Sequence, residues 1–275
     1  MTRSWIAWPV LWALVGGCGG QSYWLGQYEG HVKKGTAIIA KAKTDHERAS
    51  GYTERARGYG EKARYLRAFQ KLTLRQYAAI FDQAVEDHGE AVRLDPSSAD
   101  VYLHRGLTYY DRGFPAPPDV LEPESKAKEF RALAKADFSK AIELDGRNAL
   151  ALDRRGLILE QANDFEAAIR DYTALVAVDA RLGRSRLAEL YCRRGDQHTI
   201  AKKYELAIAD YERAIALDAP ADACDCEPYG AVAATYVEAG QYDKAWDAVH
   251  RAKAKRRWLP DDLVARLEKA SGRSK

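Results

Sequence analysis

The stretch Tyr102-Leu-His-Arg-Gly-Leu-Thr-Tyr109 decides the fold, because its pattern recurs along the chain. Four other segments align with it without gaps: Tyr52-Thr-Glu-Arg-Ala-Arg-Gly-Tyr59, Leu152-Asp-Arg-Arg-Gly-Leu-Ile-Leu159, Tyr191-Cys-Arg-Arg-Gly-Asp-Gln-His198 and Tyr229-Gly-Ala-Val-Ala-Ala-Thr-Tyr236. Each is followed by a second apolar stretch with a small residue at its centre: Ala84, Ala134, Ala168, Ala207 and Ala245. Small residues let two paired helices approach closely, while the flanking large side chains fill the remaining volume. The sequence therefore predicts five helix pairs, each made of a helix A and a helix B.

The ends of helix B support this division. Pro or Gly follows helix B in Leu94-Asp-Pro96, Leu144-Asp-Gly146 and Leu217-Asp-Ala-Pro220, where the chain turns toward the next pair. The register of residues 48–258 resembles the tetratricopeptide repeat family. This resemblance implies an all-α fold, a right-handed superhelix of stacked antiparallel helix pairs, which binds other proteins and is not an enzyme. Pro260-Asp-Asp-Leu-Val-Ala-Arg-Leu267 predicts a capping helix at its C-terminal end.

The repeats differ in length. Ala84 follows Ala56 by 28 residues, whereas Ala168 follows Gly156 by 12, so the first two units carry long inserts. We predict a signal peptide at 1–17, a lipidated tether and N-terminal segment at 18–47, repeat units at 48–98, 99–148, 149–187, 188–225 and 226–258, and a capping helix and tail at 259–275.

The two inserts have different character. In the first, Thr73 and Gln76 have capping-box spacing and predict a helix at 74–94. The second opens with Gly113-Phe-Pro-Ala-Pro-Pro-Asp-Val-Leu-Glu-Pro123, which predicts an extended loop before a helix at about 124–144. Such a loop either carries function or is a tolerated surface insertion. Between residues 19 and 47, Gly30 and Gly35 interrupt a weakly amphipathic stretch, which favours a tether that becomes helical toward Lys43.

The first residues resemble a secretory signal. Arg3 precedes an apolar stretch from Trp5 to Val15, which is shorter than the ~20 residues of a membrane-spanning helix. Val15-Gly16-Gly17-Cys18 resembles the lipobox of bacterial lipoproteins, in which the chain is cut before an acylated cysteine. With Gly19 after Cys18, the resemblance implies the periplasmic face of the outer membrane. The alternative is an ordinary cleaved signal with an incidental cysteine.

Composition and motifs exclude several functions. The formal net charge is +3 and the charges interleave, so we expect no nucleic-acid partner. The sequence has no Gly-rich phosphate loop, no His-Glu-x-x-His pair and no Gly-x-Ser-x-Gly turn. We therefore expect no catalytic residues, no cofactor, no metal site and no small-molecule substrate.

Four repeats carry a matched pair of charges. An arginine precedes the small residue of helix A and an aspartate lies at one register position of helix B: Arg55 with Asp87, Arg105 with Asp137, Arg155 with Asp171, and Arg194 with Asp210. The fifth repeat has Val232 and Ala248 at these positions, so both charges are lost together. This predicts structural ion pairs within each repeat.

Three cysteines remain if Cys18 is acylated. In an oxidising compartment an odd set suggests one bridge and one free thiol. Cys192 lies on a helix A and the loop with Cys224 and Cys226 leads into the next helix A, so we predict a disulfide from Cys192 to one of them.

The partner is expected in the groove lined by the A helices. The face opposite the packed residues carries an apolar patch in the second repeat and acidic residues in the third and fourth: Leu103, Leu107 and Tyr110, then Asp153, Leu157 and Glu160, then Asp196 and Thr199. This predicts an extended or helical segment of another envelope protein, anchored by apolar groups near Tyr110 and by Lys or Arg near the acidic residues. Alternatively, the Pro115 to Pro123 loop folds back over the apolar patch.

Two functions stay open at this point. The first is a protein-binding scaffold of the cell envelope, which resembles the repeat lipoproteins that assist assembly in the outer membrane. The second is a cytoplasmic regulatory adaptor of the same repeat family, in which the apparent signal is a misread start.

Overall fold

The structure is a computed structural model that describes residues 18–69, 73–114, 123–219, 226–260 and 262–273, with side chains from residue 26 onward except at 67–69. The described residues are almost entirely helical and contain no strand. The all-α prediction is therefore confirmed. The predicted signal peptide and most of the Pro-rich loop lie outside the described residues. The chain divides after Ala151 into two compact units, and each is described by itself.

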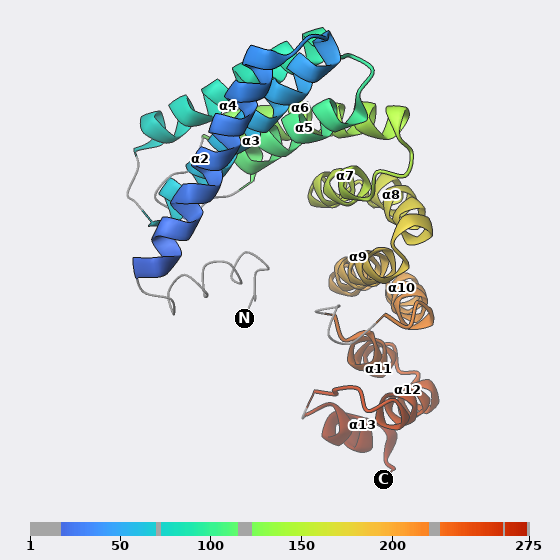
Figure 1. The fold of residues 1–275 in the computed structure, drawn as a ribbon. Helices are drawn as coiled ribbons and strands as arrows, with labels where there is room; N and C mark the ends of the chain where they lie inside the picture. The colour runs from blue at the N-terminus through green and yellow to red at the C-terminus, as the bar shows by residue number, and fades with distance from the viewer. Residues whose placement is uncertain (1–17, 70–72, 115–122, 220–225, 261, 274–275) are drawn as a thin grey trace. The chain divides into compact units, whose positions relative to one another are not determined.

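Unit 1 contains α2 (Cys18–Lys41), α3 (Asp45–Phe69), α4 (Leu74–Leu94), α5 (Ala99–Gly113) and α6 (Glu124–Leu144) (Figure 1). Successive helices pack side by side, with α3 against α2 and α4, and α5 against α6. The helix after Thr73 begins as the capping box predicts: Gln76 N donates to Thr73 Oγ1 at 3.3 Å and Thr73 N donates to Gln76 Oε1 at 3.0 Å.

The N-terminal segment differs from the expected tether. Helix α2 runs from Cys18 to Lys41 and packs along α3. Gly35 does not interrupt it, because this residue faces the α3 backbone: a Cβ there would lie 2.5 Å from Arg55 N. Gly51 and Gly58 make the same close approach from the α3 side, where a Cβ would meet Ile39 and Val32. Three glycines thus make residues 18–41 part of the fold.

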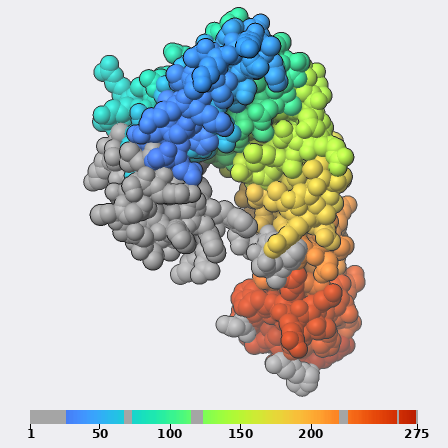
Figure 2. Space-filling model, viewed as in Figure 1, coloured from blue at the N-terminus to red at the C-terminus, as the bar shows by residue number. Residues whose placement is uncertain are grey.

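Unit 2 contains most of α7 (Ala149–Gln161), then α8 (Phe165–Val178), α9 (Ala180–Ile200), α10 (Tyr204–Ala216), α11 (Pro228–Glu238), α12 (Tyr242–Ala254) and α13 (Leu263–Ser271). The A helices α7, α9 and α11 form one layer with α13, and the B helices α8, α10 and α12 form the other (Figure 1). Side chains fill the space between the layers (Figure 2). The capping helix packs on α11 and α12 through fully buried Leu263 and Leu267, three residues later than the sequence signal at Pro260.

Helix α9 starts without a linker after α8. Asp179 ends α8 and caps α9, since its side chain accepts a hydrogen bond from Leu182 N at 3.0 Å. The reversal is tight: a Cβ at Gly183 would lie 2.4 Å from Val176 N. Among the helices that the structure describes, none is long and apolar enough to cross a membrane.

Candidate partner-binding surface

Helix A and helix B are joined in four repeats by the same ion pair. Arg105 Nε and Nη2 donate to the two carboxylate oxygens of Asp137 at 2.8 and 2.7 Å. The same two-bond arrangement joins Arg55 to Asp87, Arg155 to Asp171, and Arg194 to Asp210. All four aspartates are buried. Two parallel hydrogen bonds fix both position and orientation, so these arginines hold the repeat together.

The fifth repeat fills the same place with apolar atoms. Val232 and Ala248 are both buried, in the cluster that also contains Tyr211 and Trp246. A repeat therefore closes with either a buried ion pair or an apolar contact, and no unpaired charge is left at this position.

A second complementary pair lies at the crossing point of each repeat. A Cβ added at Gly106, Gly156 or Gly195 would lie 2.8, 2.3 or 2.7 Å from a ring carbon of Phe138, Tyr172 or Tyr211. Where helix A instead has Ala56 or Ala233, helix B has a smaller residue than these rings, His88 or Val249. The aromatic ring therefore occupies the volume that the glycine leaves.

The two tyrosine hydroxyl groups reach carboxylates on helix A. Tyr172 OH donates to Glu160 Oε2 at 3.1 Å, and Tyr211 OH donates to Asp196 Oδ1 at 2.7 Å. Burial raises the pKa of both phenols well above the usual value, so both remain protonated donors at neutral pH.

The acidic residues predicted for the groove in the third repeat are already paired within the chain. Asp153 is buried and accepts from Arg186 Nε at 2.7 Å and from Arg154 Nη1 at 2.6 Å. Buried Glu160 pairs with Arg193 Nη1 at 3.0 Å. The prediction that Asp153 and Glu160 are open to a partner is therefore wrong, because arginines on α9 reach back to α7 and neutralise them.

The remaining predicted residues of unit 2 are more accessible. Leu157 and Thr199 are half-buried, whereas Asp196 is exposed. Thr199 Oγ1 lies 3.3 Å from Tyr211 OH and 3.5 Å from Thr235 Oγ1, which links α9 to α10 and α11. Because its side chain is exposed, Asp196 stays a candidate for contact with a partner.

The apolar patch predicted in unit 1 is largely used in packing. Leu103 is buried, and Leu107 and Tyr110 are half-buried. The Tyr110 ring stacks on Phe114 at a centroid distance of 3.9 Å and lies 6.2 Å from the Phe138 ring. Tyr110 was expected on the face opposite the packed residues, but its ring lies against Phe138 on helix B of the same repeat. The loop at 115–122 lies outside the described residues, so its predicted position over the patch stays a prediction.

The cysteines also differ from expectation. Cys192 has a free thiol and is buried beside Tyr211 and Ala207. Burial raises the pKa of this thiol, which keeps it protonated. Cys226 is disulfide-bonded, and the sulfur it joins lies outside the described side chains, as does Cys224. The predicted disulfide from Cys192 is therefore wrong, because α9 turns this side chain into the core.

Two polar features of unit 1 were not predicted. Glu54 on α3 is buried and accepts from Lys34 Nζ at 2.7 Å and from His31 Nδ1 at 3.1 Å, both on α2. Burial raises the pKa of Glu54, but these hydrogen bonds outweigh it and lower the pKa overall. In the sequence, Gly51 and Gly58 are the features that could have predicted the close contact between α2 and α3.

His88 is the second feature. Its ring is fully buried and its Nε2 lies 3.1 Å from Thr108 Oγ1. Because the Thr108 hydroxyl donates to His104 O, we assign the proton to Nε2. Burial lowers the pKa of His88 to about 3, so the ring is neutral at physiological pH.

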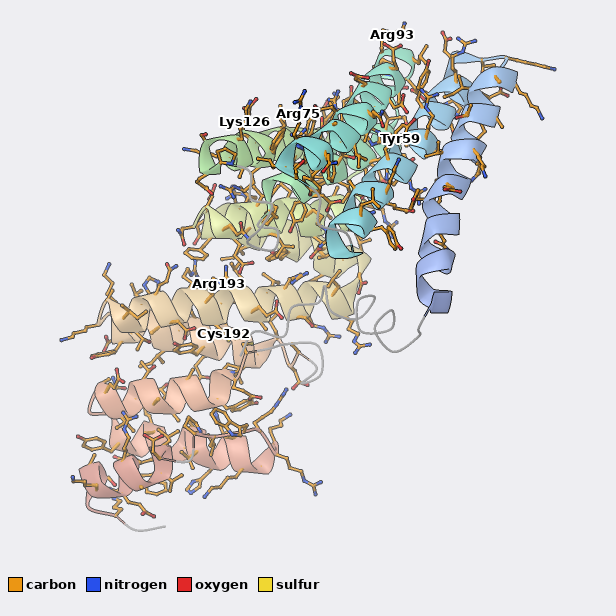
Figure 3. The ribbon with its side chains drawn as sticks, turned by 90° about the vertical axis from the view of Figure 1, so that its left-hand side faces the viewer. Tyr59, Arg75, Arg93, Lys126, Cys192 and Arg193 are labelled. Atoms are coloured by element: carbon orange, nitrogen blue, oxygen red, sulfur yellow. The ribbon has the colours of Figure 1, made fainter. Side chains whose placement is uncertain are left out.

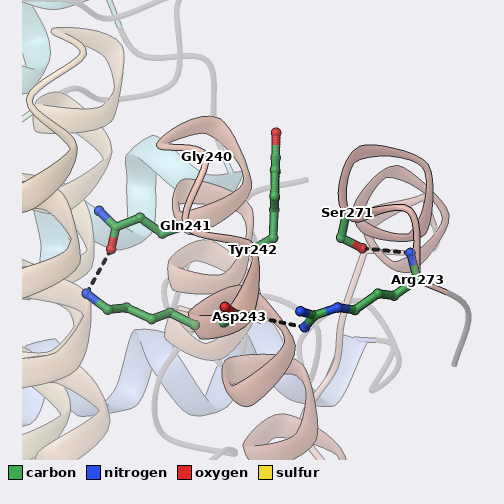
Figure 4. A pocket seen from close by; sticks show the side chains of 7 residues that line it. Gly240, Gln241, Tyr242, Asp243, Ser271 and Arg273 are labelled. Atoms are coloured by element: carbon green, nitrogen blue, oxygen red, sulfur yellow. Dashed lines mark hydrogen bonds and ion pairs between the residues drawn. The ribbon is translucent and has the colours of Figure 1, made fainter.

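A shallow hollow of about 290 Å³ lies between the start of α12 and the end of α13 (Figure 4). Its polar side chains bind one another: Lys244 Nζ donates to Gln241 Oε1 at 2.9 Å and Arg273 Nη1 to Asp243 Oδ1 at 2.5 Å. These groups do not converge on a common point, so we assign no chemistry to the hollow. The described residues also hold no cluster of three metal-ligating side chains.

The profile of the tetratricopeptide repeat family matches residues 188–220, which cover the second half of α9 and all of α10. The chain therefore contains a tetratricopeptide repeat. A search of curated protein sequences finds no match.

Several solved structures are similar in fold. The MamA protein is 18% identical, with 82% of this chain and 97% of that chain covered and a TM-score of 0.45. Pseudomonas aeruginosa pilF is 18% identical, with 81% and 86% covered and a TM-score of 0.41. BtubC from P. vanneervenii is 16% identical, with 88% and 94% covered and a TM-score of 0.47. At these values the likeness carries no argument about function.

Proposed function

We propose that this protein is a non-catalytic scaffold of the bacterial cell envelope, which is anchored by a lipid on Cys18 and binds a segment of a partner protein along the A helices of unit 2. Tetratricopeptide repeats serve as protein-protein interaction scaffolds, and residues 188–220 form such a repeat. The observation that carries the proposal is the surface of α9.

Helix α9 packs against α8, α10 and α11, and it exposes one face at helical spacing. We call this face the α9 stripe: Arg193, Asp196, Gln197 and Ile200. Arg193 lies beside Cys192 in the middle of the helix (Figure 3). Ile200 is 83% exposed, although it is a large apolar residue. A stripe with an apolar end and a carboxylate suits an amphipathic or extended peptide.

The attachment to the membrane is proposed on two grounds. Val15-Gly16-Gly17-Cys18 resembles a lipobox, and α2 begins at Cys18. A lipid on Cys18 would therefore be followed directly by the helix that packs on α3. Because one acyl chain holds a protein only weakly, the acyl chains that the sulfur and the new amino group of a lipobox cysteine carry suit stable anchoring at the periplasmic face of the outer membrane.

Palmitate labelling in a bacterial host tests this attachment. We expect label and membrane fractionation for the wild type and loss of both for Cys18→Ala, with Cys192→Ala as the matched control that keeps them. An unlabelled wild-type chain with an intact N-terminus in the cytosol would contradict the lipoprotein proposal.

A further inference from the structure

The segment that joins α12 to α13 is held to the fold on both sides of an exposed tryptophan. Before it, Arg257 Nη2 donates to Ala219 O at 3.0 Å. After it, Pro260 packs on α11, where a Cβ added at Gly230 would lie 3.0 Å from Pro260 Cδ. Trp258 lies between these two attachment points and is 59% exposed. The backbone on both sides is thus fixed, and the fold presents this indole to solvent.

Two exposed basic residues lie in the turn that precedes Trp258. Helix α12 ends in a tight turn, in which Arg256 N donates to Lys253 O at 3.1 Å and Arg257 N donates to Ala252 O at 2.9 Å. Lys253 and Arg256 are exposed, and neither forms an ion pair with another residue that the structure describes. The end of α12 therefore carries two cations and one exposed indole within six residues of chain.

The other basic residues of the run at 251–257 are used inside the fold. Arg251 Nη2 donates to Glu212 Oε1 at 2.9 Å, and Lys255 Nζ lies 3.9 Å from Asp218 Oδ1. Cations also suit the C-terminal end of a helix, because they complement its dipole. Helix stability thus accounts for much of the run, but it does not account for the exposed ring of Trp258.

Exposed cations next to an indole suit a membrane surface. Tryptophan favours the headgroup region of a bilayer, because its ring is apolar and its N–H still finds a polar partner there. Lysine and arginine are attracted to anionic headgroups. The three side chains offer far less area than the about 800 Å² per partner of a stable protein interface, which favours a lipid surface over a folded partner.

We propose that Lys253, Arg256 and Trp258 form a docking contact for a membrane surface that contains anionic phospholipid. The two cations bind headgroup phosphates, and the indole enters the interface. We call these three residues the interfacial patch. The inference goes beyond the proposed function, because unit 2 makes the contact and no lipid on Cys18 is needed for it. On a chain already held at a membrane the contact is intramolecular, so a weak patch is sufficient.

The test uses residues 18–275 with Cys18→Ser, because the apolar stretch of residues 1–17 would itself enter vesicles. An N-terminal histidine tag holds this chain on vesicles through a nickel-chelating lipid, so attachment does not depend on acylation. The vesicles contain phosphatidylcholine with or without phosphatidylglycerol, and each type is made with and without bromine on the acyl chains. Bromine quenches the fluorescence of an indole that enters the membrane.

We expect brominated phosphatidylglycerol vesicles to quench the wild-type chain more than Trp258→Phe, and this difference reports docking of the patch. Lys253→Gln and Arg256→Gln should each lower the docking equilibrium about fivefold, the effect of one basic residue at an anionic surface. High salt should lower it for the wild type as well. The matched control is Lys202→Gln with Lys203→Gln, which removes two exposed charges at the turn between α9 and α10 and should change nothing.

The outcomes bear on this contact alone. Equal quenching of wild type and Trp258→Phe overturns it, as does equal docking on vesicles with and without phosphatidylglycerol. An equal loss in the control variant would assign the effect to net charge and also overturn the patch. Circular dichroism checks the fold of each variant, and the salt dependence of the wild type gives the answer if a variant folds poorly. Failure of palmitate labelling at Cys18 would contradict the proposed function and leave this contact standing.

Discussion

The ion pair that joins helix A to helix B spans different lengths of chain in the two units. In unit 1 the paired residues are 32 positions apart, as in Arg105 and Asp137, whereas in unit 2 they are 16 apart, as in Arg155 and Asp171. The hydrogen bonds are nevertheless alike, at 2.8 and 2.7 Å against 2.8 and 2.5 Å. The crossing point of the two helices therefore sets the geometry, and the length of the connection does not.

The extra residues of unit 1 lengthen the helices away from this crossing. Helices α4 and α6 have 21 residues, against 14 and 13 in α8 and α10. The added turns bury their own contacts: Tyr77 and Phe81 pack with Ala63, and Gly113 lets α5 approach α6 near Arg131. The entropic cost of closing a loop grows slowly with its length. An insert that makes its own packing contacts can therefore be added without changing the contact between helix A and helix B.

The largest expected effect comes from breaking one ion pair in each unit. Asp137→Ala leaves Arg105 without its partner, and we expect a loss of about 3–5 kcal/mol in the free energy of unfolding. Asp171→Ala should cost the same to within about 1 kcal/mol, because doubling a loop changes its closure free energy by only ~0.6 kcal/mol. Urea unfolding followed by circular dichroism measures both.

The control for this prediction comes from the fifth repeat. Arg105→Val with Asp137→Ala copies the Val232 and Ala248 arrangement, and it should recover more than about half of the loss. If the double variant is as unstable as Asp137→Ala, the ion pair and the apolar contact are not interchangeable.

A smaller effect is expected at the glycine and aromatic contact of unit 2. In Gly156→Ala the new methyl group would lie 2.3 Å from the Tyr172 ring, so we expect a loss of about 3 kcal/mol, the upper end for overpacking. The matched control is Gly89→Ala on α4, where a Cβ meets nothing within 4 Å. That change should stabilise by about 0.5–1 kcal/mol through helix propensity. Thermal unfolding of both variants measures these changes. If Gly156→Ala is as stable as the wild type, the close contact between Gly156 and the Tyr172 ring is wrong.

The smallest expected effect is a pH dependence of the free energy of unfolding, which comes from His88 in the first repeat of unit 1. His88 has a pKa of about 3 when folded and 6.5 when unfolded, so the unfolded chain binds the extra proton between these values and stability falls as the pH falls. From pH 7 to pH 5 this residue should contribute a loss of about 2 kcal/mol. Ala56→Gly with His88→Phe, which imports the Gly106 and Phe138 pair, should remove that contribution in urea titrations at the two pH values. An unchanged pH dependence would show that His88 is not its source.

Contacts between helix A and helix B of one repeat could be predicted from the sequence, because both residues of such a contact recur at fixed positions of the repeat. The Arg and Asp register, the helix start after Thr73 and the helical character of the chain all follow from patterns of this kind. The joint change to Val232 and Ala248 pointed to the pairing of each Arg with the Asp of its own repeat.

Contacts between neighbouring helices of different repeats were decided by the tertiary structure alone. Asp153 and Glu160 looked available on their own helix, but Arg186 and Arg193 reach them from α9. Cys192 looked poised for a disulfide, but helix packing buries its thiol. Gly35 looked like a helix breaker, but its missing side chain is what allows α2 to lie against α3. A one-dimensional pattern records the faces of each helix, whereas the side chain that fills a given face depends on which helix the packing brings next to it.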